Sequence, residues 1–158
     1  MVTNSYPNPN FYPDAKWPDT LENGREFQDF VMEALAKTNV ILQNYASRKY
    51  QRDKGESLQG WEIKLDNRWT ETGRLSIELA EKTKANQERW IDSGIYRTDS
   101  WLYIQGNYQG VFIFMTKILI GLHKTKRYQE HELATIKKFY LPIEDAHKYG
   151  HFIAIEVH

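Results

Sequence analysis

Two short segments in the middle of the chain alternate apolar and polar residues with a period of two. The first, WEIKLD at 61–66, places Trp, Ile and Leu on one side and Glu, Lys and Asp on the other. The second, RLSIELA at 74–80, repeats the alternation. Successive side chains of a β-strand point to opposite faces, so the pattern predicts two strands, each with one apolar face. The connection DNRWTETG is typical of a loop, and a β-hairpin is the simplest pairing to expect for the two strands.

Helices and further strands are predicted around these two segments. We expect a helix from Asn23, a good N-cap with Glu26 as its capping-box partner, to about Thr38. Short helices are expected at 116–123 and 143–149, and further strands at 100–105, 111–115, 134–141 and 152–157. This order predicts an α/β (α+β) fold in which helices flank a mixed sheet of about four to six strands.

The length of 158 residues fits one domain, and the N-terminal end differs in composition from the rest. Four of the five prolines fall within residues 1–18, and proline at this density prevents helices and central strands. We therefore expect an extended arm at 1–22 and a single domain at 23–158. The aromatic residues of the arm favour packing on the domain or on a second copy of the chain, so a homodimer is a hypothesis.

Composition excludes several classes of protein. The 21 Lys and Arg balance the 21 Asp and Glu, which excludes nucleic-acid binding by bulk charge but leaves a local basic surface open. The absence of Cys excludes disulfide scaffolds, thiol nucleophiles and cysteine zinc sites, and fits a reducing cytoplasm. No apolar run approaches the ~20 residues of a membrane span. The start MVTNSYPNPN lacks the basic and apolar stretches of a secretory signal. We expect a cytoplasmic protein without a membrane partner.

The polar faces of the two predicted strands are the strongest candidates for chemistry. Glu62, Lys64 and Asp66 share one face, and Glu78 joins them if the hairpin forms. Facing like charges destabilise a strand pair, but a divalent cation makes them tolerable, because Mg²⁺ takes hard oxygen ligands. A neighbouring lysine can hold an attacking water or a developing negative charge, as metal-assisted phosphodiester hydrolysis requires. On periodicity alone, a solvent-exposed hairpin with cross-strand ion pairs is the more frequent outcome.

Three stretches of this region also resemble a known family. GWEIKLD at 60–66, TGRLSIE at 72–78 and SGIYR at 93–97, followed by WLYIQG, are similar to the recurrent pattern of PD-(D/E)XK nuclease-like proteins of phages and prophages. The resemblance implies a restriction-endonuclease-like core, a central mixed sheet flanked by helices with the metal site at the hairpin. It implies that Glu62 and Lys64 form the E-x-K element of a Mg²⁺-dependent deoxyribonuclease, with Mn²⁺ as a substitute and DNA as the partner.

The acidic residue that leads this family's site has no obvious counterpart here. No Pro-Asp pair precedes the E-x-K element, so Asp53 and Glu56 are its candidates. In a second registration, Glu62 is the leading acid and Glu78 the second acid, while the lysine is displaced to position 64. The metal ligands are therefore expected among Glu62, Glu78, Asp66, Glu56 and Asp53.

At two further positions the sequence differs from the family's pattern, which leaves an alternative function open. Ala80 stands where the second registration wants Lys, and Gln28 stands where the family's helix often supplies Glu, with Glu26 and Glu33 as the nearest substitutes. The alternative is a catalytically incomplete relative that binds DNA or a protein partner through the same face.

Basic residues near these elements are candidates for contacts with the phosphate backbone. Residues 117–138 carry six Lys or Arg against two Glu, and three arginines flank the acidic cluster. Solvated side chains and ion pairs within the fold are the alternative. Trp69 and Trp90 are expected to pack in loops, with base stacking as a hypothesis. The candidate phosphate contacts are Arg68, Arg74, Arg97, Lys124, Lys126 and Arg127.

Overall fold

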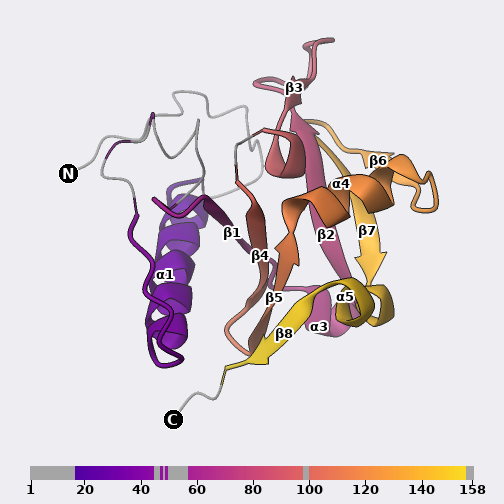
Figure 1. Ribbon diagram of the computed structural model, residues 1–158. Helices are drawn as coiled ribbons and strands as arrows, with labels where there is room; N and C mark the ends of the chain where they lie inside the picture. Colours follow the sequence, from indigo (N-terminus) through magenta and orange to yellow (C-terminus); the bar gives the residue numbers. More distant parts are fainter. Residues whose placement is uncertain (1–16, 45–46, 48, 50–56, 98–99, 156–158) are drawn as a thin grey trace.

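In the computed structural model the chain forms two four-stranded sheets with helices around them (Figure 1). The structure describes residues 17–44, 47, 49, 57–97 and 100–155. The strand order is β1-β4-β5-β8 in the first sheet and β3-β2-β7-β6 in the second. The mixture of helices and strands agrees with the expected α+β class. The expectation of one mixed sheet is wrong, because the strands divide between two sheets.

The first sheet is mixed. β1 (Trp61–Leu65) runs parallel to β4 (Leu102–Asn107), and β4 is antiparallel to β5 (Gly110–Met115). β8 (His151–Ala154) pairs with the other side of β5. Parallel strands need a long crossover connection, and here the chain between β1 and β4 passes through the second sheet.

The second sheet is antiparallel. β2 (Arg74–Glu81) pairs with β3 (Ile91–Asp92) and with β7 (Ile136–Pro142), and β6 (Glu130–Glu132) pairs with the other side of β7. The strand at 130–132 has no counterpart in the sequence-based expectation, because Glu is depleted in strands and only the pairing with β7 identifies it.

The expected hairpin between the two alternating segments is wrong. Both segments are strands, but β1 pairs with β4, whereas β2 pairs with β3 and β7. The connection contains the one-turn helix α3 (Trp69–Thr72), which Gly73 ends in the left-handed conformation at φ 66°. Alternation reports which face of a strand is apolar and carries no information about its partner. The turn of α3 takes the chain from one sheet to the other.

Helices lie outside the sheets and between them (Figure 1). They are α1 (Trp17–Ala36), α4 (Thr116–Lys124), α5 (Ile143–Tyr149) and the 3-10 turn η1 (Gly94–Tyr96). α1 begins at Trp17 rather than Asn23, so residues 17–22 are helical and do not belong to an extended arm. Pro18 is compatible with this start, because proline has no hydrogen bond to lose in a first helical turn. None of the described helices combines the length and the apolarity that a membrane crossing requires.

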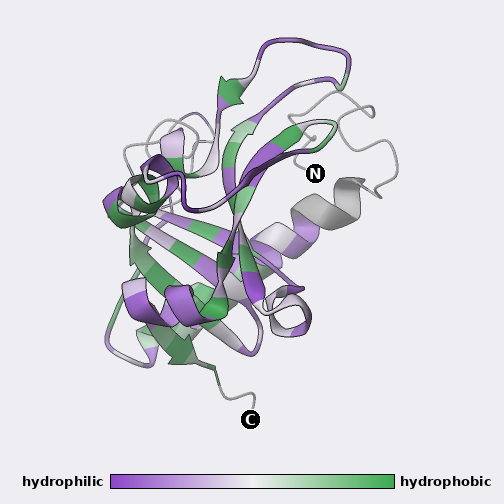
Figure 2. Ribbon diagram, turned by 90° about the vertical axis from the view of Figure 1, so that its right-hand side faces the viewer, coloured by the Kyte–Doolittle hydropathy of each residue, from purple (hydrophilic) through white to green (hydrophobic). Residues whose placement is uncertain are grey.

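Two hydrophobic clusters hold these elements together. One joins α1 to the first sheet through Phe27, Val31, Ile63 and Ile104, and the other joins the first sheet to β2, β7, α4 and α5. The neighbours Tyr103 and Ile104 of β4 belong to different clusters, as the alternation of a strand requires. Figure 2 shows the same alternation of hydrophilic and hydrophobic residues along the strands.

Candidate active site

The strands β1 and β4 present a polar row toward the second sheet. Their parallel register places Glu62 beside Tyr103 and Lys64 beside Gln105. The intervening isoleucines of both strands belong to the cluster under α1. Since neighbouring side chains of a strand point to opposite faces, the Glu62 and Lys64 side chains point away from α1.

The polar face of the second sheet forms the opposite wall. In β2, Arg74, Ser76 and Glu78 alternate with leucine and isoleucine residues that are buried in the second cluster. The register of β7 places Tyr140 beside Ser76 and Lys138 beside Glu78. The side chains of β2 and β7 that do not enter the core therefore meet the polar row of the first sheet.

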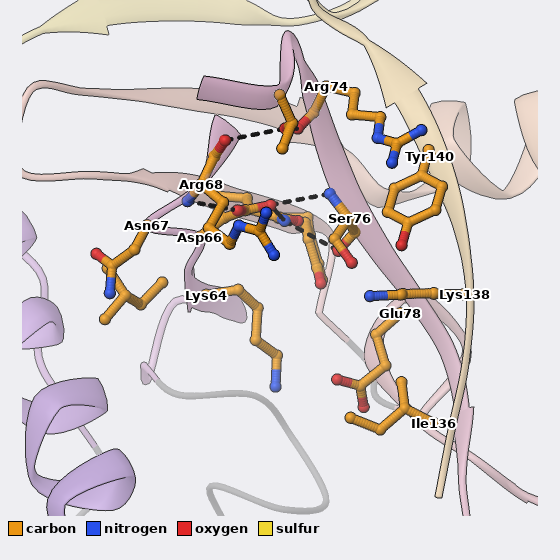
Figure 3. Close-up of a pocket in the computed structure, with 14 residues that line it drawn as sticks. Lys64, Asp66, Asn67, Arg68, Arg74, Ser76, Glu78, Ile136, Lys138 and Tyr140 are labelled. Atoms are coloured by element: carbon orange, nitrogen blue, oxygen red, sulfur yellow. Dashed lines mark hydrogen bonds between the residues drawn. The ribbon is translucent and has the colours of Figure 1, made fainter. Parts of the chain in front are cut away.

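A pocket of about 390 Å³ lies between these walls (Figure 3), within the usual size of a small-ligand site. Figure 3 shows Lys64 and Glu78 directing their charged ends toward the same part of the pocket. Glu78 thus shares a site with Lys64 and Asp66, although β1 and β2 are not paired. The charged lining residues are Lys64, Arg68, Arg74, Lys138, Asp66 and Glu78.

Glu62 lies behind the pocket wall and contacts Lys64. Its side chain is 1% exposed, and its Oε1 atom lies 2.9 Å from Nζ of Lys64, which is 27% exposed. This ion pair does not have hydrogen-bond geometry, and both carboxylate oxygens are buried without a hydrogen bond to any described residue. A buried carboxylate without such donors is costly unless a cation compensates its charge. Lys64 supplies part of that compensation and connects Glu62 to the pocket.

Two more buried oxygen atoms of the polar row have no hydrogen bond to the described residues. They are the Tyr103 hydroxyl and the Oε1 atom of Gln105. Burial raises the pKa of Tyr103, the nearby Lys64 ammonium opposes the rise, and the Glu78 carboxylate adds to it. The phenol therefore stays protonated. These atoms and the Glu62 carboxylate are hard oxygen donors of the same polar row, the ligand type that Mg²⁺ and Mn²⁺ prefer over soft metal ions.

Asp66 joins the two sheets. Its Oδ2 atom accepts hydrogen bonds from the backbone N–H of Ser76 and from Nε2 of Gln105, both at 2.9 Å. Its Oδ1 atom accepts one from the backbone N–H of Arg68 at 3.2 Å. Because three donors already occupy this carboxylate, its contacts favour a structural role over the expected role of metal ligand.

The carboxylate of Glu78 is held by the turn that follows β3. The buried hydroxyl of Ser93 donates a hydrogen bond to Oε1 of Glu78, and the Ser93 backbone N–H donates to the carbonyl of Leu79 at 3.0 Å. Gly94 follows at φ 50°, where a Cβ atom would collide with the carbonyl oxygen of Glu78. The SGIYR segment therefore forms a turn that packs directly on the strand carrying Glu78.

Among the described residues, no three His, Cys, Asp or Glu side chains group as a metal site. Glu62, Asp66 and Glu78 therefore do not form the expected three-carboxylate cluster. A cation here would be held by Glu62 and by the buried oxygens of Tyr103 and Gln105. Asp53 and Glu56, the other expected ligands, lie outside the described residues.

Only two of the six candidate phosphate contacts, Arg68 and Arg74, line the pocket. Three others form ion pairs elsewhere, and Lys124 is exposed at the end of α4. The ion pairs join Arg97 to Glu81 at 3.9 Å, Lys126 to Glu130 at 3.6 Å and Arg127 to Asp145 at 3.2 Å.

Neither of the two loop tryptophans lines the pocket. The Trp69 ring packs against Phe112 and Phe152, as the packing expectation requires. The Trp90 ring is contacted by the ammonium groups of Lys82 at 4.2 Å and Lys137 at 5.0 Å.

Tyr103, Gln105 and Tyr140 line the pocket without having been candidates from the sequence, and Lys138 was expected only as part of the basic run at 117–138. The segment IKKFYLP does place Lys138 and Tyr140 on one side of a strand. That pattern could have suggested them, but only the pairing of β7 with β2 brings them to Glu78.

In comparisons with family models, with curated proteins and with solved structures, nothing matches the chain. The resemblance to PD-(D/E)XK nucleases therefore stays a prediction from the sequence.

Proposed function

We propose that the protein is a metal-dependent nuclease of the PD-(D/E)XK type, which hydrolyses phosphodiester bonds in DNA. The observation that carries the proposal is the buried Glu62 carboxylate, which has no hydrogen bond to the described residues and pairs with a lysine that lines the pocket. A buried anion beside unpartnered hard oxygens favours a divalent cation such as Mg²⁺ or Mn²⁺. The lack of Cys supports a reducing compartment, the cytoplasm.

Each residue of the proposed site would have a separate role in such a reaction. Glu62 and the buried oxygens of Tyr103 and Gln105 would hold a cation, which would supply Lewis-acid activation of the phosphodiester. Lys64 holds the attacking water or the negative charge that develops on the phosphate. Ser93 fixes one oxygen of Glu78, whose other oxygen can accept a proton from that water. Arg68, Arg74 and Lys138 line the same pocket and bind the phosphate backbone.

A second candidate function is DNA binding without cleavage. It is favoured by Asp66, whose carboxylate is occupied by three hydrogen bonds, and by the absence of a three-carboxylate group among the described residues. In that case the cations of the pocket bind phosphate, and Glu62 can be replaced without loss of affinity for DNA.

A cleavage assay tests the proposal. The purified protein is incubated with supercoiled plasmid and with single-stranded DNA, in Mg²⁺, in Mn²⁺ and in EDTA. We expect metal-dependent cleavage that falls about 100-fold or more in Lys64→Ala, the usual loss when a group that stabilises transition-state charge is removed. Lys148→Ala is the matched control, because Lys148 is exposed on α5 and does not line the pocket.

Circular dichroism establishes that each variant is folded. Cleavage that Lys64→Ala leaves unchanged contradicts the proposed site. If no metal ion supports cleavage and a gel shift detects bound DNA, the second candidate function replaces the first.

A further inference from the structure

The polar face of the second sheet, which forms one wall of the pocket, carries a row of cationic and aromatic side chains. The register places Tyr140 beside Ser76, Lys138 beside Glu78, and His131 of β6 beside Lys138. Arg74 lies two residues before Ser76 and shares its face. Arg74, Tyr140, Lys138 and His131 thus occupy one face across β2, β7 and β6, opposite the face that enters the core.

Tyr140 lies at the centre of this row. The Arg74 guanidinium carbon lies 3.9 Å from the centre of its ring, and the Lys138 ammonium lies 5.0 Å from it. The His131 ring lies 4.8 Å away at an angle of 54°. Within the described part of the chain, neither Arg74 nor Lys138 forms a salt bridge. No ion pair with a described residue therefore neutralises the charge of Arg74 or of Lys138.

The row runs directly into the candidate active site. Arg74, Lys138 and Tyr140 line the pocket together with Lys64 and Glu78, and Figure 3 shows Tyr140 between Arg74 and Lys138 along its wall. A ligand that follows the row would therefore arrive at Lys64. The volume of about 390 Å³ falls within the usual range of ligand sites.

We propose that this face binds single-stranded DNA and guides it into the pocket, an inference that rests on the proposed function. Proteins that bind single strands combine cations along the backbone with flat groups on which unpaired bases stack. Tyrosine rings and arginine guanidinium planes both serve as such platforms. The exposed Arg74 guanidinium lies over the Tyr140 ring, so the two groups form one stacking platform, while Lys138 and Lys64 supply charge toward the reacting phosphate. A duplex keeps its bases stacked inside the helix and cannot use the Tyr140 platform.

Fluorescence anisotropy tests the inference with a labelled single-stranded oligonucleotide and with the duplex of the same sequence. The titrations are made in EDTA, so that no cleavage occurs. We expect the wild-type protein to bind the single strand at least about tenfold more tightly than the duplex. Tyr140→Leu should weaken single-strand binding about tenfold, and Tyr140→Phe should retain it, because stacking needs the ring and not the hydroxyl.

Tyr149→Leu is the matched control for the loss of the ring. Tyr149 also has an ammonium over its ring, that of Lys148 at 5.1 Å, but it does not line the pocket. We expect this variant to bind the single strand like the wild type. Arg74→Gln provides a second variant at the exposed start of β2. It should reduce the slope of log K against log salt concentration by about 0.7, the value for one phosphate contact on a single strand.

Equal affinity for single strand and duplex overturns the inference. So does a folded Tyr140→Leu protein with wild-type affinity, or an Arg74→Gln protein with an unchanged salt slope. The binding experiment and the cleavage assay can fail independently of each other. A protein that binds single strands in this way but never cleaves contradicts only the proposed nuclease, whereas an active nuclease without the single-strand preference contradicts only this inference.

Discussion

Glu62 is the residue on which the proposed site depends most. Its carboxylate is taken out of water and receives no hydrogen bond from the described residues, and it has one ion pair, with Lys64 at 2.9 Å. Leaving a buried polar group without its partners costs free energy of folding. A protein that keeps such a group sacrifices stability for function, which is a common property of active sites.

Removing the Tyr103 hydroxyl should change stability and activity in opposite directions. It is buried without a hydrogen bond to the described residues, so Tyr103→Phe should raise the free energy of unfolding in EDTA by about 1 kcal/mol. The same change should weaken cleavage, because it removes one oxygen of the proposed cation site. Urea unfolding followed by circular dichroism gives the first quantity.

Tyr128→Phe is the control for the predicted gain in stability, because it removes a hydroxyl that does form a hydrogen bond. The Tyr128 hydroxyl donates a hydrogen bond to Asp145 at 2.7 Å, and burial together with that bond raises the pKa of Tyr128 to about 12. Its loss should lower the free energy of unfolding by about 2 kcal/mol, because the acceptor is charged. Equal shifts in the two variants would contradict the difference that we draw between the two hydroxyls.

Ser93 is expected to act through Glu78. The Ser93 hydroxyl donates to Oε1 of Glu78, so Ser93→Ala should release the carboxylate and lower kcat about 10- to 100-fold with little change in KM, as misplaced catalytic groups do. Steady-state cleavage kinetics measure both quantities. Ser57→Ala removes an equally buried hydroxyl, which accepts a hydrogen bond from the Trp61 backbone and lies outside the pocket. If both variants lose the same activity, the effect is one of stability.

At the scale of elements, strands were easier to predict than their partners. The alternation at 61–66 and 74–80 identified β1 and β2, because side-chain period follows from backbone geometry. The pairing of β1 with β4 depends on contacts between residues about 40 apart, which no local pattern reports. β6 was missed for the same reason, since its three polar residues become a strand only beside β7.

A hydrogen-bonded chain joins η1, α4 and β6. His123 contacts the Tyr96 hydroxyl through Nδ1 at 2.7 Å and Oε1 of Glu130 through Nε2 at 2.8 Å. The hydrogen bond from His123 lowers the pKa of Glu130 below its usual 4.5, against the opposing effect of burial, and nearby lysines add to the decrease. The ionised carboxylate therefore stabilises the folded state.

This shift predicts how Glu130 contributes to stability at different pH values. Because the pKa is lower in the folded state, the contribution is complete above the unfolded pKa and is lost as the pH falls through the folded pKa. Urea unfolding should show the largest difference between wild type and Glu130→Gln above about pH 5, and a vanishing difference in more acidic solution. A difference that stays constant from about pH 6 to about pH 3 would contradict the role of the ionised carboxylate.

At the scale of the whole molecule, the first sheet separates two hydrophobic clusters and the site lies where the sheets face each other. The sequence predicted Glu62, Lys64 and Glu78 as neighbours, but for a wrong reason, because no hairpin joins them. Lys64 and Glu78 share the pocket because Asp66 and Gln105 tie the first sheet to Ser76, and Glu62 lies beside Lys64. The walls contributed by β4 and β7 could not be predicted, since they require the three-dimensional arrangement of strands distant in sequence.

The two clusters should unfold together. Ile104 lies fully buried in the cluster under α1, and Leu75 lies fully buried in the other. Either residue changed to Ala should lower the free energy of unfolding by about 2–5 kcal/mol, in one transition seen equally by circular dichroism and tryptophan fluorescence. Two separate transitions in either variant would mean that the sheets are independent units.

The most direct test of the central claim, that Glu62 belongs to a cation site beside Lys64, is a Mn²⁺ titration by isothermal calorimetry. Glu62→Gln is compared with the wild type and with Glu144→Gln, an exposed carboxylate on α5. We expect Mn²⁺ to bind the wild type and the Glu144→Gln control equally, and to bind Glu62→Gln at least about tenfold more weakly, because a neutral amide replaces a buried carboxylate ligand. Wild-type affinity in a folded Glu62→Gln protein would contradict the claim.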